Sequence, residues 1–330
     1  MRKRLLALLS SFDRKKIAVV GDLIADEFLY GQIARVSREA PVLILQYRET
    51  TRMPGGAANA ANNLLELGGR VRVVGPVGRD EAGRYLVRML DRRGADTRLV
   101  SQPAGYATPV KTRILAGARH SAPQQVVRID RVLEIPSDYT PPFKSAARAF
   151  RDCDGVILSD YGYGAASPAL AGELGGYGRR RSIPVVGDSR FRMCDFCDVT
   201  SLTPNITELE AATGTVIGDD AALLHKKGLE IVRRQNLEHL LVTQGRFGMT
   251  LIHAERPPLH IPIYGTDDVA DVTGAGDTVI AVFTLALACG GDPAAAARLA
   301  NSAGGIVVMK RGTATVSRRE LEETVRDDLG

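Results

Sequence analysis

Short apolar runs alternate along the chain with stretches whose apolar residues recur at helical spacing. The first run ends at Gly21 and Asp22, and the later runs likewise end in polar residues or glycine. Short, uninterrupted runs of this kind are typical of parallel strands buried on both faces. The strands predicted on this basis are residues 17–20, 71–74, 156–158, 185–186 and 240–242. We therefore predict an α/β fold in which helices cover a mostly parallel sheet, with ligands bound at the carboxyl ends of its strands.

Two segments, at about residues 28–53 and 108–132, do not follow this pattern of apolar runs and helical spacing. Apolar and polar residues alternate in both, as in 42–47 and 110–115, which is typical of strands with one face in solvent. We predict that they form a small β-sheet lid inserted into the main domain. Because the sequence has neither an internal repeat nor a linker-like stretch, residues 1–330 are expected to form a single domain.

Composition and charge narrow the class of function. The 330 residues carry a net charge of +5, and the basic residues are spread along the chain rather than gathered in one run. This distribution favours an acidic small molecule as the partner and disfavours nucleic acid. The apolar stretch at residues 5–9 is too short for a signal peptide or a membrane span. It predicts an amphipathic helix, no membrane partner and a cytoplasmic location.

Cys194 and Cys197 have the C-x-x-C spacing of redox and zinc sites. Four zinc ligands would need a second pair or a histidine cluster nearby, and the sequence offers neither. We therefore expect two reduced thiols in a loop. A zinc or redox role for the pair is the alternative.

The glycine-rich segment 271–278, Asp-Val-Thr-Gly-Ala-Gly-Asp-Thr, is followed at once by a helical apolar run at 279–288. Small residues at a helix start let the backbone aim free amide groups at an anion. Asp277, in the first turn of that helix, is expected to accept a proton from a hydroxyl nucleophile. The alternative for Asp277 is a plain helix cap. The residues predicted to bind an oxyanion or phosphate are Gly274, Ala275 and Gly276.

A second glycine pair, Gly55 and Gly56, precedes a helical pattern that ends near Leu67. Paired glycines at a helix start allow a ligand to approach the backbone closely, and the amide of Asn59 suits sugar hydroxyls. Asp22, just after the first predicted strand, lies at the same edge of the sheet and is expected to hold two vicinal hydroxyls. The alternatives are a helix start packed tightly on the sheet and an ordinary turn aspartate.

Several catalytic motifs are absent from the sequence. It has no G-x-x-x-x-G-K-[ST] phosphate loop, no G-x-G-x-x-G between a strand and a helix, no G-x-S-x-G nucleophile elbow and no H-E-x-x-H zinc motif. Only five histidines are present, so carboxylates are left for acid–base work. A phosphate-transferring enzyme with this sequence would have to act without the P-loop lysine.

Taken together, the two glycine motifs at 55–59 and 271–278 resemble the two signatures of the ribokinase-like (PfkB) sugar kinases. Their order and wide separation make the pair far more specific than either motif alone. The resemblance implies a three-layer α/β/α sandwich with a small β-sheet lid. It also implies an ATP-dependent carbohydrate kinase that uses magnesium, with potassium as a further cation near the segment from Asp271. Other segments that match in order are 21–22, 203–210, 241–248 and 300–304.

Within this family the sequence is most similar to kinases that phosphorylate the anomeric hydroxyl of D-glycero-β-D-manno-heptose 7-phosphate. That reaction gives the 1,7-bisphosphate used for ADP-heptose and the lipopolysaccharide core. Because the cytidylyltransferase often fused behind these kinases is not in the chain, a standalone kinase is expected. The similar segments are 30–42, 124–130, 159–161 and 312–317.

The sequence also departs from the heptose kinases. Tyr163 and Arg190 stand where those kinases have lysine, and the loop at 117–123 is longer. These departures leave the fold and the chemistry intact but bear on the sugar. The alternatives are another kinase of the family, acting on ribose, fructose, fructose 1-phosphate or a nucleoside, and a non-catalytic sugar-binding protein.

The resemblance also implies roles for individual residues. Asp277 would be the catalytic base, and the amides of the 274–276 turn would stabilise the phosphoryl group in flight. Asn205 and Glu208 would organise magnesium and the ATP phosphates, with Glu208 acting through water. The expected nucleotide contacts are Thr243, Gly245, Gly248 and Asn301, and the expected sugar contacts are Asp22, Gly55, Gly56 and Asn59.

A sugar phosphate needs cationic partners, and the predicted lid supplies them. Arginine and lysine side chains suit phosphate oxygens, whereas the alternative for each is a solvated strand face. The lid's exposed strand edges and apolar residues also predict a homodimer formed by two lids. The cations expected to bind the substrate phosphate are Lys111, Arg113 and Arg128, with Arg35 on the other lid segment.

Overall fold

The apolar run at residues 17–20 forms β1 (Lys16–Gly21), the strand around which the main sheet is built. The structure is a computed structural model that describes residues 1–117, 123–132, 146–265 and 270–327. The other strands of this sheet are β4 (Arg70–Pro76), β5 (Asp96–Ser101), β8 (Gly155–Asp160), β9 (Val185–Ser189), β10 (Ser201–Leu202), β11 (His239–Thr243), β12 (Met249–His253) and β13 (Leu259–Ile261).

These nine strands pair in the order β13-β12-β11-β10-β9-β8-β1-β4-β5. Neighbours from β5 to β11 run parallel, and β12 and β13 join antiparallel at one end. The five predicted strands are therefore confirmed as β1, β4, β8, β9 and β11. Their polar endings meet at one edge of the sheet because parallel strands share the direction in which they end.

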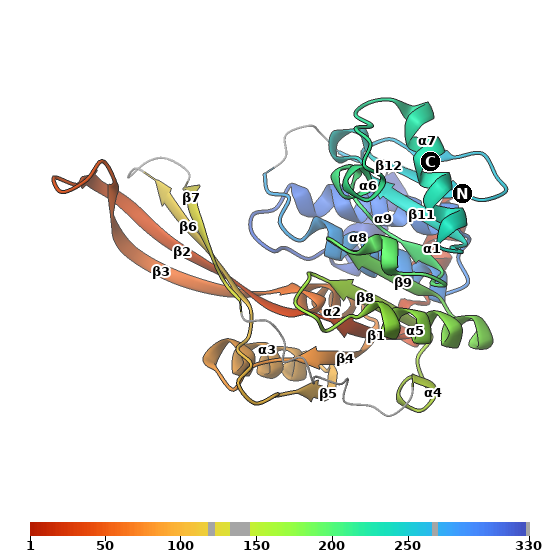
Figure 1. Ribbon diagram of the computed structural model, residues 1–330, viewed down its shortest axis with the longest axis horizontal. Coiled ribbons are helices and arrows are strands. Elements are labelled where there is room, and N and C mark those ends of the chain that lie inside the picture. Colours follow the sequence, from red (N-terminus) through yellow and green to blue (C-terminus); the bar gives the residue numbers. More distant parts are fainter. Residues whose placement is uncertain (118–122, 133–145, 266–269, 328–330) are drawn as a thin grey trace.

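Helices cover both faces of the main sheet (Figure 1). Ile17 and Val19 of β1 belong to one buried cluster, and Ala18 and Val20 belong to another. This alternation is what a strand buried on both faces requires. The predicted three-layer α/β/α sandwich, and the amphipathic helix at the N-terminus, are confirmed.

The first cluster contains residues from α1 (Arg2–Leu9), α2 (Ala57–Glu66), α3 (Glu81–Arg92), α8 (Ala275–Ala288), α9 (Pro293–Val308) and α10 (Arg318–Asp327). The second contains residues from α5 (Pro168–Arg181), α6 (Ile206–Thr213) and α7 (Ala221–Arg234). Short helical turns are α4 (Ala146–Ala149), η1 (Phe12–Arg14), η2 (Met193–Asp195) and η3 (Gly245–Phe247).

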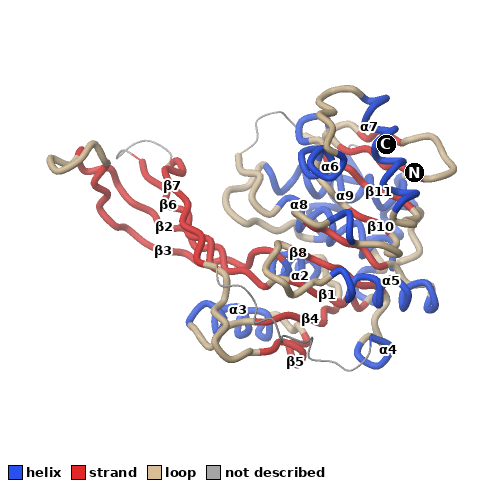
Figure 2. The backbone as a smooth tube through the Cα atoms, in the orientation of Figure 1, coloured by secondary structure: helices blue, strands red, loops and turns tan. Residues whose placement is uncertain are grey.

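A second sheet, which we call the lid sheet, is made of β2 (Leu23–Val36), β3 (Leu43–Gly56), β6 (Val110–Gly117) and β7 (Gln124–Arg131). Its order is β3-β2-β6-β7, with β2 and β6 parallel and the outer pairs antiparallel. The strands come from the two segments with alternating polarity. Figure 1 shows this sheet projecting from the body, and in Figure 2 its outer part extends beyond the described helices.

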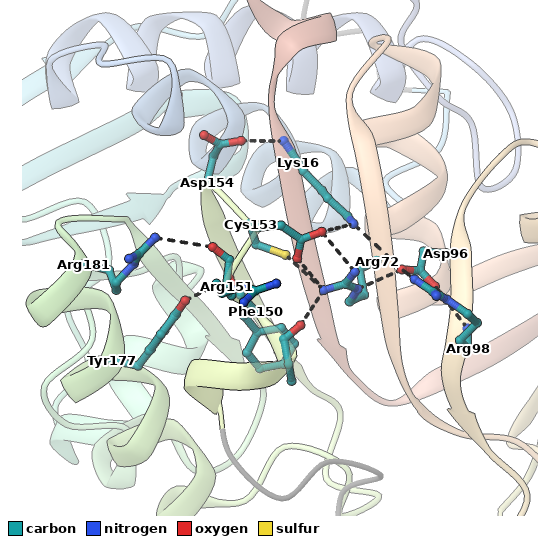
Figure 3. A network of polar contacts seen from close by, with 12 residues as sticks. Lys16, Arg72, Asp96, Arg98, Phe150, Arg151, Cys153, Asp154, Tyr177 and Arg181 are labelled. Atoms are coloured by element: carbon teal, nitrogen blue, oxygen red, sulfur yellow. Dashed lines mark hydrogen bonds and ion pairs between the residues drawn. The ribbon is translucent and has the colours of Figure 1, made fainter.

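An ion-pair network lies at the amino-terminal ends of the strands of the main sheet, around Arg72 near the start of β4 (Figure 3). The Arg72 Nε lies 2.9 Å from Asp96 Oδ2, and its Nη1 lies 2.7 Å from Asp152 Oδ1. Lys16 contacts the second Asp152 oxygen at 2.7 Å. The network therefore ties together the starts of β1, β4 and β5 and the turn before β8.

We expect Arg72→Met to lower the free energy of unfolding by about 2 kcal/mol, because the largely buried carboxylate of Asp96 loses its most buried partner and keeps only Lys16 at 3.8 Å and the exposed Arg98. Urea-induced unfolding measures this loss. Arg98→Met is the matched control, since Arg98 contacts the same Asp96 at 2.8 Å from a side chain that is 82% exposed. Its loss should be below about 1 kcal/mol, and equal losses for the two variants would contradict the assigned role of burial.

Candidate active site

The glycine-rich segment 271–278 forms a tight turn into α8. Gly274 is the N-cap residue, with a φ of 80° in the left-handed region. A Cβ on Gly274 would lie 2.5 Å from the Asn59 Nδ2, so the position requires glycine. The amide of Ala275 closes the turn by donating to the carbonyl of Val272 at 3.2 Å. The first amides of a helix lack partners within it, so this turn is suited to bind an anion.

Asp277 lies in the first turn of α8 and is only 3% exposed. The Asn59 Nδ2 donates to its Oδ2, and the Tyr161 hydroxyl donates to its Oδ1, each at 2.9 Å. Burial raises the pKa of Asp277 to about 7, although these two hydrogen bonds and the charge of Lys111 oppose the shift. A carboxylate with a pKa near neutrality is well matched to accept a proton from a hydroxyl.

Asp277 faces a cavity of about 640 Å³ between the carboxyl edge of the main sheet and the lid sheet. Most of the residues singled out in the sequence line it. Those on the cavity wall are Gly56, Lys111, Arg113, Arg128, Asn205, Glu208, Thr243, Gly245, Gly248, Gly274, Ala275, Gly276, Asp277 and Asn301. The fold therefore brings the two glycine motifs and the segments between them to one place.

Asn205 and Glu208 form a capping box at the start of α6. The Asn205 Oδ1 accepts from the Glu208 amide, and the Glu208 Oε2 accepts from the Asn205 amide, both at 2.9 Å. Asp188 lines the same cavity, and burial together with the charge of Glu208 raises its pKa. Two carboxylates that repel each other offer the oxygen ligands that magnesium prefers, so the site fits a divalent cation that also binds ATP phosphates and water.

Strand β11 carries Thr243 to the cavity next to Asn205, with which it forms an isolated β-bridge. Gly248 has a φ of 82°, and a Cβ there would lie 2.1 Å from the carbonyl oxygen of Ile261. Only glycine can therefore close this turn between β11 and β12. Asn301 on α9 donates from Nδ2 to the Pro262 carbonyl at 2.8 Å, which fixes its side chain in the cavity wall.

Asp26, on β2, is a cavity residue that the sequence reasoning missed. Its Oδ1 pairs with the Arg113 Nη1 at 2.5 Å, and its Oδ2 accepts from the Thr313 hydroxyl at 3.1 Å. A Cβ on Gly55 would lie 2.5 Å from that Oδ2, so Gly55 makes room for Asp26 rather than lining the cavity. An acidic pair, Asp26 and Glu27, inside the apolar run at residues 23–29 is the signal that could have revealed Asp26.

The structure places two more expected sugar contacts behind the cavity wall. The carboxylate of Asp22 is fully buried and accepts from the amides of Tyr161, Tyr163 and Ala165 at 2.8, 3.1 and 3.0 Å. Asp22 therefore holds the loop after β8. Asn59 is also fully buried, and its side-chain Nδ2 donates to Asp277. Among the described residues, neither side chain lines the cavity.

The four lid cations fall into different environments. Arg113 is paired with Asp26, and Arg128 is paired with Asp130 through its Nε at 2.8 Å. Lys111 is only 6% exposed, and its Nζ lies 4.6 Å from the centroid of the Tyr161 ring. Burial lowers the pKa of Lys111. Arg35 lies toward the outer end of β2, outside the set of residues that line the cavity.

Both departures from the heptose kinases lie beside Lys111. Tyr163 faces its ammonium, with the Nζ 5.9 Å from the ring centroid, and Arg190 lines the cavity and influences the pKa of Lys111 through its charge. Tyr161 and Arg190 are thus further cavity residues to which the sequence had assigned no role. Of the longer loop at 117–123, residues 118–122 lie outside the described residues.

The cysteines take no part in this site. All four are free, and the Cys194 Sγ accepts from the Arg234 guanidinium at 2.9 Å. Within residues 1–117, 123–132, 146–265 and 270–327, no group of three His, Cys, Asp or Glu side chains is placed to hold a metal ion. In the same part of the chain, no helix is both long and apolar enough to cross a membrane.

Comparison with known proteins places this site in a family. The model of the pfkB family carbohydrate kinases matches residues 14–123 and 194–320. The bifunctional protein HldE of Geobacter metallireducens is 42% identical over 308 residues, covering 92% of this chain and 61% of the relative. HldE of Pelobacter propionicus is 39% identical over 324 residues, covering 96% of this chain and 65% of the relative. The chain thus spans slightly less than two thirds of the length of these relatives.

Solved structures share the fold. A ribokinase from Arabidopsis thaliana, complexed with ribose and ATP, superposes with a TM-score of 0.72 at 19% identity, covering 94% of this chain and 98% of that one. Phosphofructokinase-2 from Escherichia coli gives a TM-score of 0.71 at 16% identity, covering 94% and 98%. At these identities the likeness concerns the fold, which is ribokinase-like. With a family model that matches most of its length, the chain belongs to the pfkB family of carbohydrate kinases and, as a member, is an ATP-dependent sugar kinase.

Proposed function

We propose that this kinase phosphorylates the anomeric hydroxyl of D-glycero-β-D-manno-heptose 7-phosphate, giving the 1,7-bisphosphate for ADP-heptose synthesis. The observation that carries the proposal is the cationic cluster of Lys111, Arg128 and Arg190 on the cavity wall. Tyr161 bridges this cluster to the base, because Lys111 packs on its ring and its hydroxyl donates to Asp277. A sugar that carries a phosphate at one end and a reactive hydroxyl at the other fits this arrangement of charges.

The nucleotide is assigned to the other half of the cavity. Thr243, Gly245 and Gly248 would contact the triphosphate and ribose, and Asn301 would lie beside the adenine. Glu208, through water, and Asn205 would hold magnesium, which when bound neutralises charge on the ATP phosphates. Potassium is a further proposed cation near the segment from Asp271, whose carboxylate accepts from the amides of Thr273 and Gly312.

In the proposed reaction, Asp277 takes the proton of the anomeric hydroxyl while that oxygen forms a bond to the γ-phosphorus of ATP. The bond between this phosphorus and the bridging oxygen breaks, and ADP leaves with the electron pair. The amides of Gly274 and Gly276 stabilise the charge on the transferring phosphoryl group, while the Ala275 amide holds the turn closed on Val272. Because Asp26 is an acceptor already fixed by Arg113 and Thr313, we assign it a hydrogen bond from a sugar hydroxyl.

ADP release with magnesium-ATP across a panel of acceptors tests this substrate. The panel contains heptose 7-phosphate, ribose, fructose, fructose 1-phosphate and a nucleoside. A kcat/KM for heptose 7-phosphate well above the others supports the proposal. Preference for an unphosphorylated sugar would overturn the heptose assignment while leaving a sugar kinase. No turnover with any acceptor would favour a sugar-binding protein on a kinase fold.

We further propose a cytoplasmic homodimer formed by two lid sheets. The ATP that the reaction consumes is a cytoplasmic metabolite. The edge strands of the lid sheet are β3 and β7, and several large apolar side chains on this sheet are exposed, including Val36 at 60% and Tyr47 at 64%. Open edges and apolar surface favour pairing with a second copy. Light scattering is expected to give twice the 35.4 kDa of one chain, and a monomer at micromolar concentration would contradict the dimer.

A further inference from the structure

We propose that Tyr161 is a positioning residue that holds Asp277 ionised and in one orientation for proton abstraction. The inference rests on the proposed function, because it concerns the same base, and it adds a residue to which the sequence assigned no role. Tyr161 follows β8 directly, in the loop whose amides are fixed by the buried carboxylate of Asp22. The phenol therefore comes from a rigid part of the sheet edge.

The geometry leaves Asp277 little freedom. Tyr161 donates to one carboxylate oxygen and Asn59 to the other, each at 2.9 Å, so the plane of the carboxylate is fixed from two sides. Each carboxylate oxygen has two lone pairs, so a position for the substrate hydroxyl is retained. Asn59 is itself held, since its Oδ1 accepts from the Asn63 Nδ2 at 3.2 Å. Tyr161 and Asn59 thus act as two fixed donors on either side of the base.

The hydroxyl of Tyr161 stays protonated, and therefore remains a donor, over the whole pH range used in these experiments. Burial and the negative charge of Asp277 hold the pKa of the phenol well above its usual range. A donor of this kind favours the charged form of the carboxylate. The other groups that act on Asp277 are Lys111 on β6, which favours its charged form, and Asp26 on β2, which opposes it. The carboxylate of Asp188 on β9 faces the same space and also interacts with Asp277.

Tyr161→Phe removes this one donor and keeps the ring on which Lys111 packs. In the wild type, kcat/KM should fall tenfold per pH unit below about pH 7, because the base must be ionised. In the variant, the midpoint of that acidic limb should move up by about one pH unit, the size expected for a hydrogen bond to a charged group. The profile is measured with whichever acceptor of the panel is turned over best, so its outcome does not depend on the identity of the sugar.

The matched control is Tyr177→Phe. Tyr177 is buried, and its hydroxyl donates to the Phe150 carbonyl at 2.9 Å, away from the cavity. This control should lose stability but keep the acidic limb of the wild type. An unshifted limb in Tyr161→Phe, or an equal shift in both variants, would overturn the inference.

A stability measurement tests the same inference without catalysis. Burial raises the folded pKa of Asp277 above its unfolded value of 3.8, so the stability linked to its protonation is present at low pH and is lost as pH rises toward 7. In Tyr161→Phe the folded pKa of Asp277 is expected to be about one unit higher, so stability continues to fall until about pH 8. The variant should therefore be more destabilised at pH 9 than at pH 5 by about 1.4 kcal/mol, the equivalent of one pKa unit.

When Tyr161→Phe is made in an Asp277→Asn background, the loss of stability that it causes should be the same at pH 9 and at pH 5. If the loss is still larger at pH 9 in that background, the pH dependence comes from a group other than Asp277, and the inference is overturned. If no sugar is phosphorylated but this difference is found, the proposed function fails while the contact between Tyr161 and Asp277 stands. The two failures are thereby distinguishable.

Discussion

Asp277→Asn is expected to lower kcat by about a thousandfold while leaving the Kd for ATP within about twofold of the wild type. Asparagine keeps the size of the side chain and an oxygen that can accept from Asn59, but it cannot take up a proton. The residual rate would come from the anion-binding turn and from the positioning of the two substrates. Steady-state ADP release gives kcat, and a fluorescent ATP analogue gives the Kd.

Asp220→Asn is the matched control for this prediction. Asp220 is the N-cap residue of α7, accepts from the Leu223 amide at 2.9 Å, and lies outside the residues that line the cavity. The control makes the same chemical change at another helix start, and its kcat should equal that of the wild type. An Asp277→Asn variant that retains near wild-type kcat would refute the role of Asp277 as the base.

Lys111→Met is expected to raise the KM for a phosphorylated acceptor by roughly ten- to a hundredfold, the range of a lost contact to a charged group. The KM for ATP should not change, because we assign the nucleotide to the other half of the cavity. The side chain of Lys111 is almost fully buried and, among the described residues, has no salt bridge within 4 Å. Methionine fills nearly the same volume, so the variant removes the charge with little effect on packing.

Comparison of two acceptors makes this prediction specific. With an unphosphorylated analogue of the same sugar, Lys111→Met and the wild type should have similar KM values. Arg131→Met is the control, since Arg131 is a lid cation that pairs with Glu27 at 2.8 Å and does not line the active-site cavity. Equal increases in KM for both acceptors would show that Lys111 acts on the sugar rather than on its phosphate.

The sequence predicted the fold well because the pattern of apolar residues within a short segment is enough to identify each strand or helix. Uninterrupted apolar runs identify strands buried on both faces, and alternation identifies the lid strands. The turn that ends at Asp277 was found for the same reason, since glycine at 274 is required by a local backbone conformation. Features that depend on φ angles, helix starts and strand ends can be inferred from neighbouring residues alone.

The partners of charged residues could not be inferred in this way. The chain passes from β1 into β2 around Asp22, so sequence spacing did not reveal which carboxylate, Asp22 or Asp26, faces the cavity. The pairing of Arg113 with Asp26 depends on the parallel register of β2 and β6, in which Phe28 lies opposite Arg113. Tyr161 was missed because its hydroxyl meets Asp277 across 116 residues of sequence.

Phosphorus NMR of the product shows which oxygen of the sugar receives the phosphoryl group. The purified enzyme is incubated with magnesium-ATP and heptose 7-phosphate, and the sugar product is examined for the position of the new phosphate. We expect a second phosphorus signal that is coupled to the anomeric proton, beside the unchanged signal of the phosphate at position 7. We also expect this signal to be missing when Asp277→Asn is incubated for the same time. A new phosphate on any other carbon, or a product with a single phosphorus signal, would contradict phosphorylation of the anomeric hydroxyl.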